Sequence, residues 1–137
     1  SGASVSAYGG KTVGAAGGAK DNKVVVNGAG EGTLSNVYGG AVTNAGSGGD
    51  VTGNTVTLTG GTVTDAVYGG YTNGSGKTTG NHVNLGDGSA ATLAAGTNLD
   101  NAALYGGNQS DVTGNTLNVM VKDAKAQRRT SINIRSI

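Results

Sequence analysis

Two short motifs alternate along the chain and constrain its fold more than any other feature. The first is Tyr-Gly-Gly, and the second is a strand-like run that begins at an asparagine, as in GNTVTLTG (53–60). The tyrosines of the first motif are Tyr8, Tyr38, Tyr68 and Tyr105. The asparagines of the second motif are Asn22, Asn54, Asn81 and Asn115. Self-similarity at such a spacing indicates a solenoid, in which each repeat forms one coil.

Aliphatic and polar side chains alternate after each asparagine. In the run 53–60, Val56 and Leu58 would point to one side of an extended strand and the threonines to the other. The equivalent aliphatic pairs in the other repeats are Val24/Val26, Val83/Leu85 and Leu117/Val119. A second strand near each Tyr-Gly-Gly carries Leu34 and Val37, Val63 and Val67, or Ala102 and Leu104. Parallel stacking, with strands about 4.8 Å apart, would turn these pairs into inward-facing aliphatic ladders.

The composition agrees with such a coil. The chain has 28 glycines and no proline, cysteine, tryptophan or phenylalanine, so its core must be a thin stack of small aliphatic side chains. The asparagines are expected to stack through their amides, and the glycine pairs to supply positive φ angles at corners between strands. The sequence therefore predicts an all-β fold: a right-handed parallel β-helix (β-solenoid) of about four coils with roughly 30 residues each.

The chain divides into a repeat domain, 1–121, and a basic tail, 122–137. The open end of a solenoid needs cover. The tail is therefore expected to form a cap, one more coil, or a strand donated to a neighbouring subunit, and these three alternatives stay open. It lacks the aromatic and repeated arginine features of a nucleic-acid-binding segment, so no nucleic-acid partner is expected. No stretch has the length and apolarity of a membrane span.

The Tyr-Gly-Gly and GNTVTL repeats resemble those in passenger regions of bacterial autotransporter adhesins and related secreted β-helix proteins. The resemblance covers residues 1–121 and implies a right-handed parallel β-helix, export to the bacterial outer surface, and a role in adhesion, aggregation or biofilm contacts. It carries no set of catalytic residues. Residues 1–137 show no pattern expected of a signal peptide or an outer-membrane barrel, and the tail is not expected to continue the repeats.

The stretch GGYTNGSGKTTGN (69–81) looks like a nucleotide-binding loop but fails its pattern. The glycine stands one residue too early, and a strand-like run rather than a helix follows Lys77. Aligning the repeats on their asparagines instead places Asp50, Lys77 and Asp111 in one column, which we interpret as surface charges on adjacent coils. The alternative, a polysaccharide lyase site, would need more acids or arginines in one groove.

Metal and ice-binding sites are weakly indicated. Residues 45–53 match the calcium-binding nonapeptide of parallel β-rolls at Gly46, Gly48 and Asp50, but only one imperfect copy exists. Calcium therefore remains an open alternative to the expectation of no cofactor. His82 is the sole histidine, so neither a metal site nor a catalytic triad is expected. The threonine columns are too irregular for ice binding.

The sequence thus predicts a non-enzymatic, structural and adhesive segment of a bacterial cell-surface or secreted β-helix protein. Its partners would be host or bacterial surface proteins or glycans. The regions expected to make contact are the loops 41–50 and 71–80 and the insertion 87–96. The tyrosines Tyr8, Tyr38, Tyr68, Tyr71 and Tyr105 would be further ligand contacts if they are exposed, but a structural stack beside the Gly-Gly turn is the preferred interpretation. Two alternatives remain: a filament subunit that self-associates end to end, and a polysaccharide-binding or lyase-like β-helix.

Overall fold

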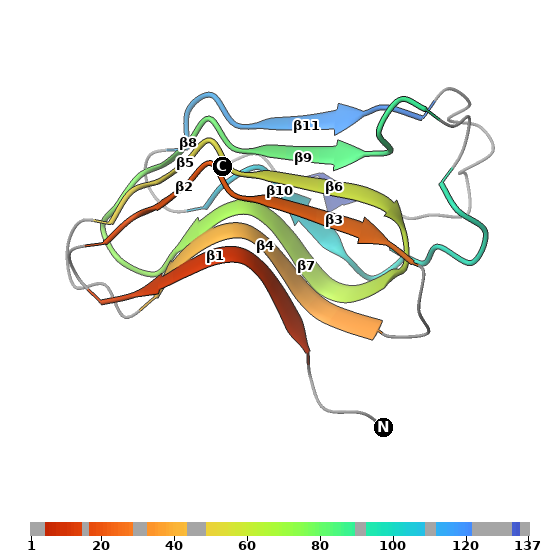
Figure 1. Cartoon of the computed structure of the whole chain (residues 1–137), viewed down its shortest axis with the longest axis horizontal. Coiled ribbons are helices and arrows are strands. Elements are labelled where there is room, and N and C mark those ends of the chain that lie inside the picture. Colours follow the sequence, from red (N-terminus) through yellow and green to blue (C-terminus); the bar gives the residue numbers. More distant parts are fainter. Residues whose placement is uncertain are drawn as a thin grey trace.

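The computed structural model describes residues 5–14, 17–28, 33–43, 49–89, 93–108, 112–121 and 133–134. All of its regular elements are strands (Figure 1). They are β1 (Ser6–Val13), β2 (Ala19–Lys20), β3 (Lys23–Asn27), β4 (Thr33–Thr43), β5 (Val51–Thr52), β6 (Thr55–Gly60), β7 (Thr62–Thr72), β8 (Thr78–Thr79), β9 (His82–Leu85), β10 (Ala103–Tyr105), β11 (Thr116–Val119) and β12 (Asn133–Ile134). Within these residues no helix is long and apolar enough to cross a membrane.

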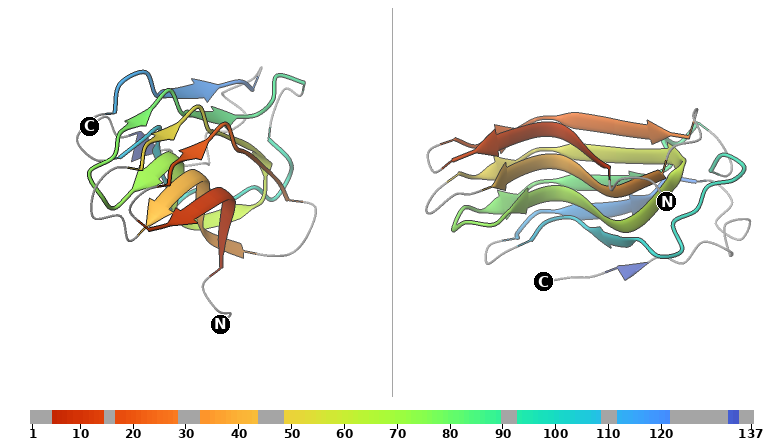
Figure 2. Two further views of the ribbon diagram at one scale, coloured as in Figure 1. Left: turned by 60° about the vertical axis from the view of Figure 1, so that its left-hand side comes forward. Right: turned by 90° about the horizontal axis from the view of Figure 1, so that it is seen from below.

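The strands form three parallel sheets that wind into the predicted β-solenoid. Sheet A has the order β1-β4-β7-β10-β12, sheet B has the order β2-β5-β8, and sheet C has the order β3-β6-β9-β11. Every neighbouring pair is parallel. The chain passes from sheet A through sheet B to sheet C and then returns to sheet A one layer further on, so that the strands lie in stacked rungs (Figure 2).

The solenoid makes about three complete turns rather than the four predicted. The three complete turns are β1-β2-β3, β4-β5-β6 and β7-β8-β9. The next turn contributes β10 and β11, and the described residues between them include no sheet B strand. Finally, β12 adds a fifth strand to sheet A, with Ala103 opposite Asn133 and Leu104 opposite Ile134.

The aliphatic pairs seen in the sequence form the core in register. Val24, Val56, Val83 and Leu117 align across sheet C, and so do Val26, Leu58, Leu85 and Val119. In sheet A, Leu34 pairs with Val63, and Val37, Val67 and Leu104 form a second column. The interior members of these columns are fully or almost fully buried, whereas the last rung is more open, with Val119 51% exposed. Burial of small side chains is thus shared between neighbouring coils.

Candidate functional site

Four tyrosines stack into a ladder on the outside of sheet A. Tyr8, Tyr38, Tyr68 and Tyr105 align in adjacent strands, and each follows an inward-facing residue in a strand where side chains alternate between faces. The ring centroids are 4.7, 5.3 and 4.9 Å apart along the ladder, and consecutive planes differ by 6°, 5° and 10°. The ladder is an aromatic stripe running across all four coils.

A neighbouring column closes over this ladder. Lys11, Ala41 and Tyr71 occupy equivalent positions in consecutive strands of sheet A. Because Ala41 is small, Tyr71 can lean across it, and its ring meets Tyr38 and Tyr68 edge-on at centroid distances of 5.3 and 5.1 Å. In the first coil, Lys11 Nζ lies 4.7 Å from the centroid of Tyr8, a cation–π contact.

These contacts restrict what the tyrosines can bind. Tyr38 and Tyr68 each have both ring faces covered by neighbouring rings, so a ligand can reach only their edges and hydroxyl groups. Sugar recognition by aromatic residues usually uses the apolar ring face. The geometry therefore favours a structural role for the ladder, and ligand contact by the five tyrosines stays a prediction.

The two interior phenols of the tyrosine ladder, those of Tyr38 and Tyr68, have raised pKa values. Burial raises the pKa of Tyr38 to about 12, helped by the adjacent phenols and by Asp65. Burial likewise raises the pKa of Tyr68, with Tyr105 and Tyr71 contributing. A phenolate at Tyr38 or Tyr68 would lose hydration and repel its neighbours, so the folded chain favours the protonated form of these two rings.

The four asparagines form a second ladder, joined by hydrogen bonds inside the coil. Asn54 Oδ1 accepts from the backbone N–H and from Nδ2 of Asn22, both at 2.9 Å. Asn81 Oδ1 accepts the same two donors of Asn54, and Asn115 Oδ1 accepts those of Asn81, at 2.8–3.0 Å. Nδ2 of Asn54, Asn81 and Asn115 also donates to a sheet B carbonyl of the previous coil, at Ala19, Val51 and Thr78 respectively. Asn115 Nδ2 donates to the Val112 carbonyl as well.

The glycine pairs make room for this ladder, and their predicted role at corners was wrong. Gly39 and Gly40 lie inside β4, and neither has a positive φ. A Cβ on Gly40 would lie 2.6 Å from the amide atoms of Asn54, so any side chain there would displace the asparagine. Gly70 stands in the same relation to Asn81, and Gly69-Gly70 lies inside β7 rather than at a corner. Tyr-Gly-Gly and the asparagine thus recur together because they pack together.

Glycines with positive φ angles do occur at corners, and one set stands directly before the asparagines. Gly53, Gly80 and Gly114 have φ angles of 69°, 65° and 72°, in the left-handed region that favours glycine. Asp21 takes this place in the first repeat with a φ of 55°, and it is the one non-glycine residue with a positive φ in the described part of the chain.

The charge column is only partly described. Pairing of Val51 with Thr78 places Asp50 and Lys77 in adjacent coils, as predicted from the alignment. The backbone N–H of Lys77 donates to Asp50 Oδ1 at 3.0 Å. Asp111 lies outside the described residues. Asp50 therefore holds the start of the next coil through the main chain, which is a structural use of its carboxylate.

The structure brings together no metal or catalytic constellation among the residues it describes. No group of three or more His, Cys, Asp or Glu side chains there could hold a metal ion. Gly46 and Gly48 of the calcium-like stretch lie outside the described residues. On the outer face of sheet C, His82 Nδ1 lies 2.6 Å from Thr116 Oγ1, and Asn118 Nδ2 donates to Asn84 Oδ1 at 2.8 Å. The expectations of no enzyme activity and no cofactor stay predictions.

Leu93 and Ala94 of the insertion 87–96 lie against the coil, which was not anticipated. Leu93 is 6% exposed and belongs to the core cluster. The backbone N–H of Ala94 donates to the Thr59 carbonyl at 2.8 Å, and Asn98 pairs with Thr62 beyond it. Leu93, in the stretch AATLAAG, is the only sequence feature that could have indicated this burial. No equivalent residue occurs in the other repeats, so the repeat alignment could not assign it to the core.

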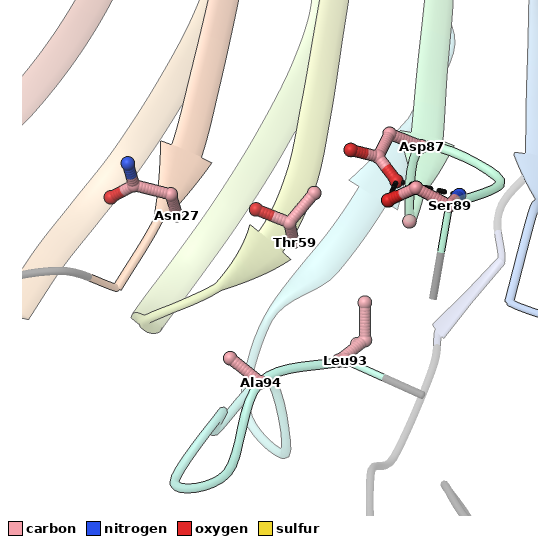
Figure 3. A pocket seen from close by; sticks show the side chains of 7 residues that line it. Asn27, Thr59, Asp87, Ser89, Leu93 and Ala94 are labelled. Atoms are coloured by element: carbon pink, nitrogen blue, oxygen red, sulfur yellow. Dashed lines mark hydrogen bonds between the residues drawn. The ribbon is translucent and has the colours of Figure 1, made fainter. Parts of the chain in front are cut away.

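A pocket lies between this insertion and the ends of the sheet C strands. Its cavity volume is about 230 Å³. Asn27, Thr59 and Asp87 stand at or just beyond the ends of β3, β6 and β9, and Leu93 and Ala94 lie across from them (Figure 3). Gly86 and Ser89 complete the lining. It combines amide, hydroxyl and carboxylate groups with a small apolar surface.

The Asp87 carboxylate is held in place by its own turn. Asp87 Oδ1 accepts from the backbone N–H of Ser89 at 2.9 Å and from the Ser89 hydroxyl. The Ser89 hydroxyl and then its N–H lower the pKa of Asp87 below the ordinary value. The pocket therefore presents a charged, oriented carboxylate at neutral pH.

Comparison with known proteins adds no family to this description. Neither a protein-family model, nor a curated protein, nor a solved structure matches the chain. The class that the structure defines is the parallel β-solenoid, built on tyrosine and asparagine ladders.

Proposed function

We propose that this chain is a structural and adhesive segment of a bacterial extracellular β-solenoid protein. It provides a stiff rod whose connecting segments and insertion meet surface proteins or glycans of a host or of other bacteria. Catalysis plays no part in this role.

The observation that carries the proposal is that the strands keep the same register although the repeats differ in length. Tyr38 pairs with Tyr68, 30 residues later, and Tyr68 pairs with Tyr105, 37 residues later. The tyrosine register is kept across both intervals, and Leu93 and Ala94 of the insertion contact the edge of the coil. A scaffold of this kind can carry different loops at fixed positions, which is how many binding proteins separate recognition from stability.

The ladders support the rod-like role. Each turn bonds to the next through backbone pairs, stacked rings and asparagine amides, so adding turns lengthens the body without requiring a wider core. The predicted contact loops are shorter than the sequence suggested, because residues 41–43 lie in β4, 71–72 in β7 and 78–79 in β8. Residues 44–48 of the first loop lie outside the described residues. The described contact regions that remain for testing are the connection 73–77 and residues 87–89 and 93–96 of the insertion.

Adhesion can be measured with fluorescent beads coated with the purified chain. We expect these beads to bind epithelial monolayers or Gram-negative cells, or to clump, well above the level of albumin-coated beads. A variant with Asn73, Ser75 and Lys77 changed to glycine keeps the backbone N–H of residue 77 and tests the connection. Equal binding by chain-coated and albumin-coated beads on every surface, without clumping, would falsify the proposal.

A filament subunit is a second candidate, favoured by the open edge of the first coil. In the described residues β1, β2 and β3 each have a neighbouring strand on one side only. The other end is uneven, because sheet A continues to β12 whereas sheet C stops at β11. Sedimentation velocity over a hundredfold concentration range distinguishes the two roles. Sedimentation coefficients that increase with concentration would support a filament subunit, and a monomer at every concentration would reject it.

A further inference from the structure

We propose that the pocket formed by Asn27, Thr59, Asp87, Ser89, Leu93 and Ala94 binds a single neutral sugar unit of a glycan. This ligand class deepens the adhesive function proposed above and rests on it. The occupant is argued from the size, lining and charge of the pocket.

The size of the pocket suits one ring. Its cavity of about 230 Å³ is smaller than the roughly 300–1,000 Å³ typical of sites for drug-sized ligands. A single hexose, or the terminal unit of a longer chain, fits this scale. The rest of a glycan would extend into solvent along the edge of the coil.

The lining matches both sides of a sugar. Both described bonds from Ser89 go to Asp87 Oδ1, which leaves Oδ2 to accept from a ligand hydroxyl. A carboxylate forms strong, charge-assisted hydrogen bonds, so Asp87 can hold a ligand hydroxyl. Leu93 and Ala94 offer an apolar patch for the C–H face of the ring.

The charge of the pocket selects among sugars. Asp87 is the charged residue in the lining, and no lysine or arginine is among the described residues that form it. Uronic and sialic acids would place a second carboxylate beside Asp87 without a cation to offset the repulsion. Neutral sugars are therefore preferred.

The pocket is also pre-formed. The insertion side is fixed by burial of Leu93 and by the bond from the Ala94 N–H to Thr59, and Thr97 bonds back to the Ala94 carbonyl. The opposite side consists of the ends of β3 and β6, which are held in the sheet C ladder, and of the exposed turn after β9, in which Ser89 bonds to Asp87. Such a site loses little conformational entropy on binding, so a ligand that makes few contacts can still bind.

The test is a titration of the ¹⁵N-labelled chain with methyl glycosides of glucose, galactose and mannose, and with glucuronate. We expect at least one neutral glycoside at millimolar concentration to shift the amide signals of Thr59, Asp87, Ser89 and Ala94, with glucuronate weaker. Asp87→Ala should weaken binding about tenfold or more, as expected for loss of a hydrogen bond to a charged group. Ala94→Leu should block the pocket while retaining the backbone bond to Thr59.

The matched control is Asp100→Ala, which removes an exposed carboxylate outside the pocket and should leave binding unchanged. Absence of shifts with every neutral glycoside overturns the sugar site, as do shifts that map to the tyrosine ladder or persist in Ala94→Leu. The bead assay separates this failure from failure of the adhesive role: adhesion that survives Asp87→Ala rejects the pocket alone, and loss of adhesion by the unmodified chain rejects the broader function.

Discussion

Replacing Asn81 by alanine should destabilise the coil far more than the same change at Asn22. Asn81 is fully buried and uses its whole amide: Oδ1 accepts from the N–H and Nδ2 of Asn54, and Nδ2 donates to the Val51 carbonyl and to Asn115 Oδ1. Asn22 is half-buried at the end of the ladder, and its side chain donates one bond, to Asn54 Oδ1.

The expected magnitudes follow from the groups left without partners. In Asn81→Ala, two donors on Asn54 and the carbonyl of Val51 lose their bonds inside the core, at about 1–3 kcal/mol each. Asn115 Oδ1 keeps its bond from the backbone N–H of residue 81. Allowing for water entering the space, the net loss is about 3–5 kcal/mol. In Asn22→Ala, Asn54 Oδ1 keeps the backbone donor, so the loss is about 0.5–1.5 kcal/mol.

Urea unfolding followed by far-UV circular dichroism measures this difference, provided that the slope with urea is the same in both variants. Hydrogen exchange gives a local check, because the amide of Asn54 should lose protection in Asn81→Ala. Equal losses of unfolding free energy in the two variants would refute the reasoning, since the interior amides would then add nothing beyond the end of the ladder.

The remaining predictions concern the ladder spaces, the phenols and the insertion. Gly40→Ala should lower the free energy of unfolding more than Gly96→Ala in the same urea assay. A Cβ at Gly40 meets the Asn54 amide, whereas one at Gly96 meets nothing within 4 Å and is disfavoured only by the φ of 83°. The reverse order would argue against a packing role for Gly40. Tyr38 should ionise near pH 12 by absorbance at 295 nm. Since its folded pKa lies above the ordinary 10.0, its stabilising effect is complete below pH 10 and lost between about pH 10 and 12, and Tyr38→Phe should make this decline shallower. Leu93→Ala should lower the free energy of unfolding by about 2–4 kcal/mol, whereas a loss below about 0.5 kcal/mol would place the insertion outside the core.

The stacking of the coil could be predicted because its signals repeat. Aliphatic residues at alternate positions fix which face of a strand is buried, and the recurrence of Val56 and Val83 at the same distance from an asparagine fixes the register. The tyrosine and asparagine columns follow from the same alignment. Turn number was slightly overestimated because a recurring motif does not require a strand in all three sheets.

Other features could not be predicted because they depend on space rather than pattern. Glycine is used both where φ is positive and where a neighbouring atom leaves no room for a Cβ. The sequence Gly39-Gly40 alone does not distinguish these two uses. Only the coil geometry shows that the pair faces Asn54. Leu93 belongs to a segment found in one repeat, so no periodicity placed it in the core, and the pocket beside it arises from residues of three successive coils.

The asparagine ladder also gives the rod a direction. Nδ2 of Asn22, Asn54 and Asn81 each donates one hydrogen bond to the asparagine of the next coil, so these amide–amide bonds all point the same way. In the described part of the chain no donor is bonded to Asn22 Oδ1, so an acceptor faces outward at the first coil. If the first coils of two chains met, the Asn22 Oδ1 atoms of both chains would face each other, and neither could donate a hydrogen bond to the other. Any junction that extends the ladder must therefore join unlike ends, which gives an assembly of such rods a single polarity along its whole length.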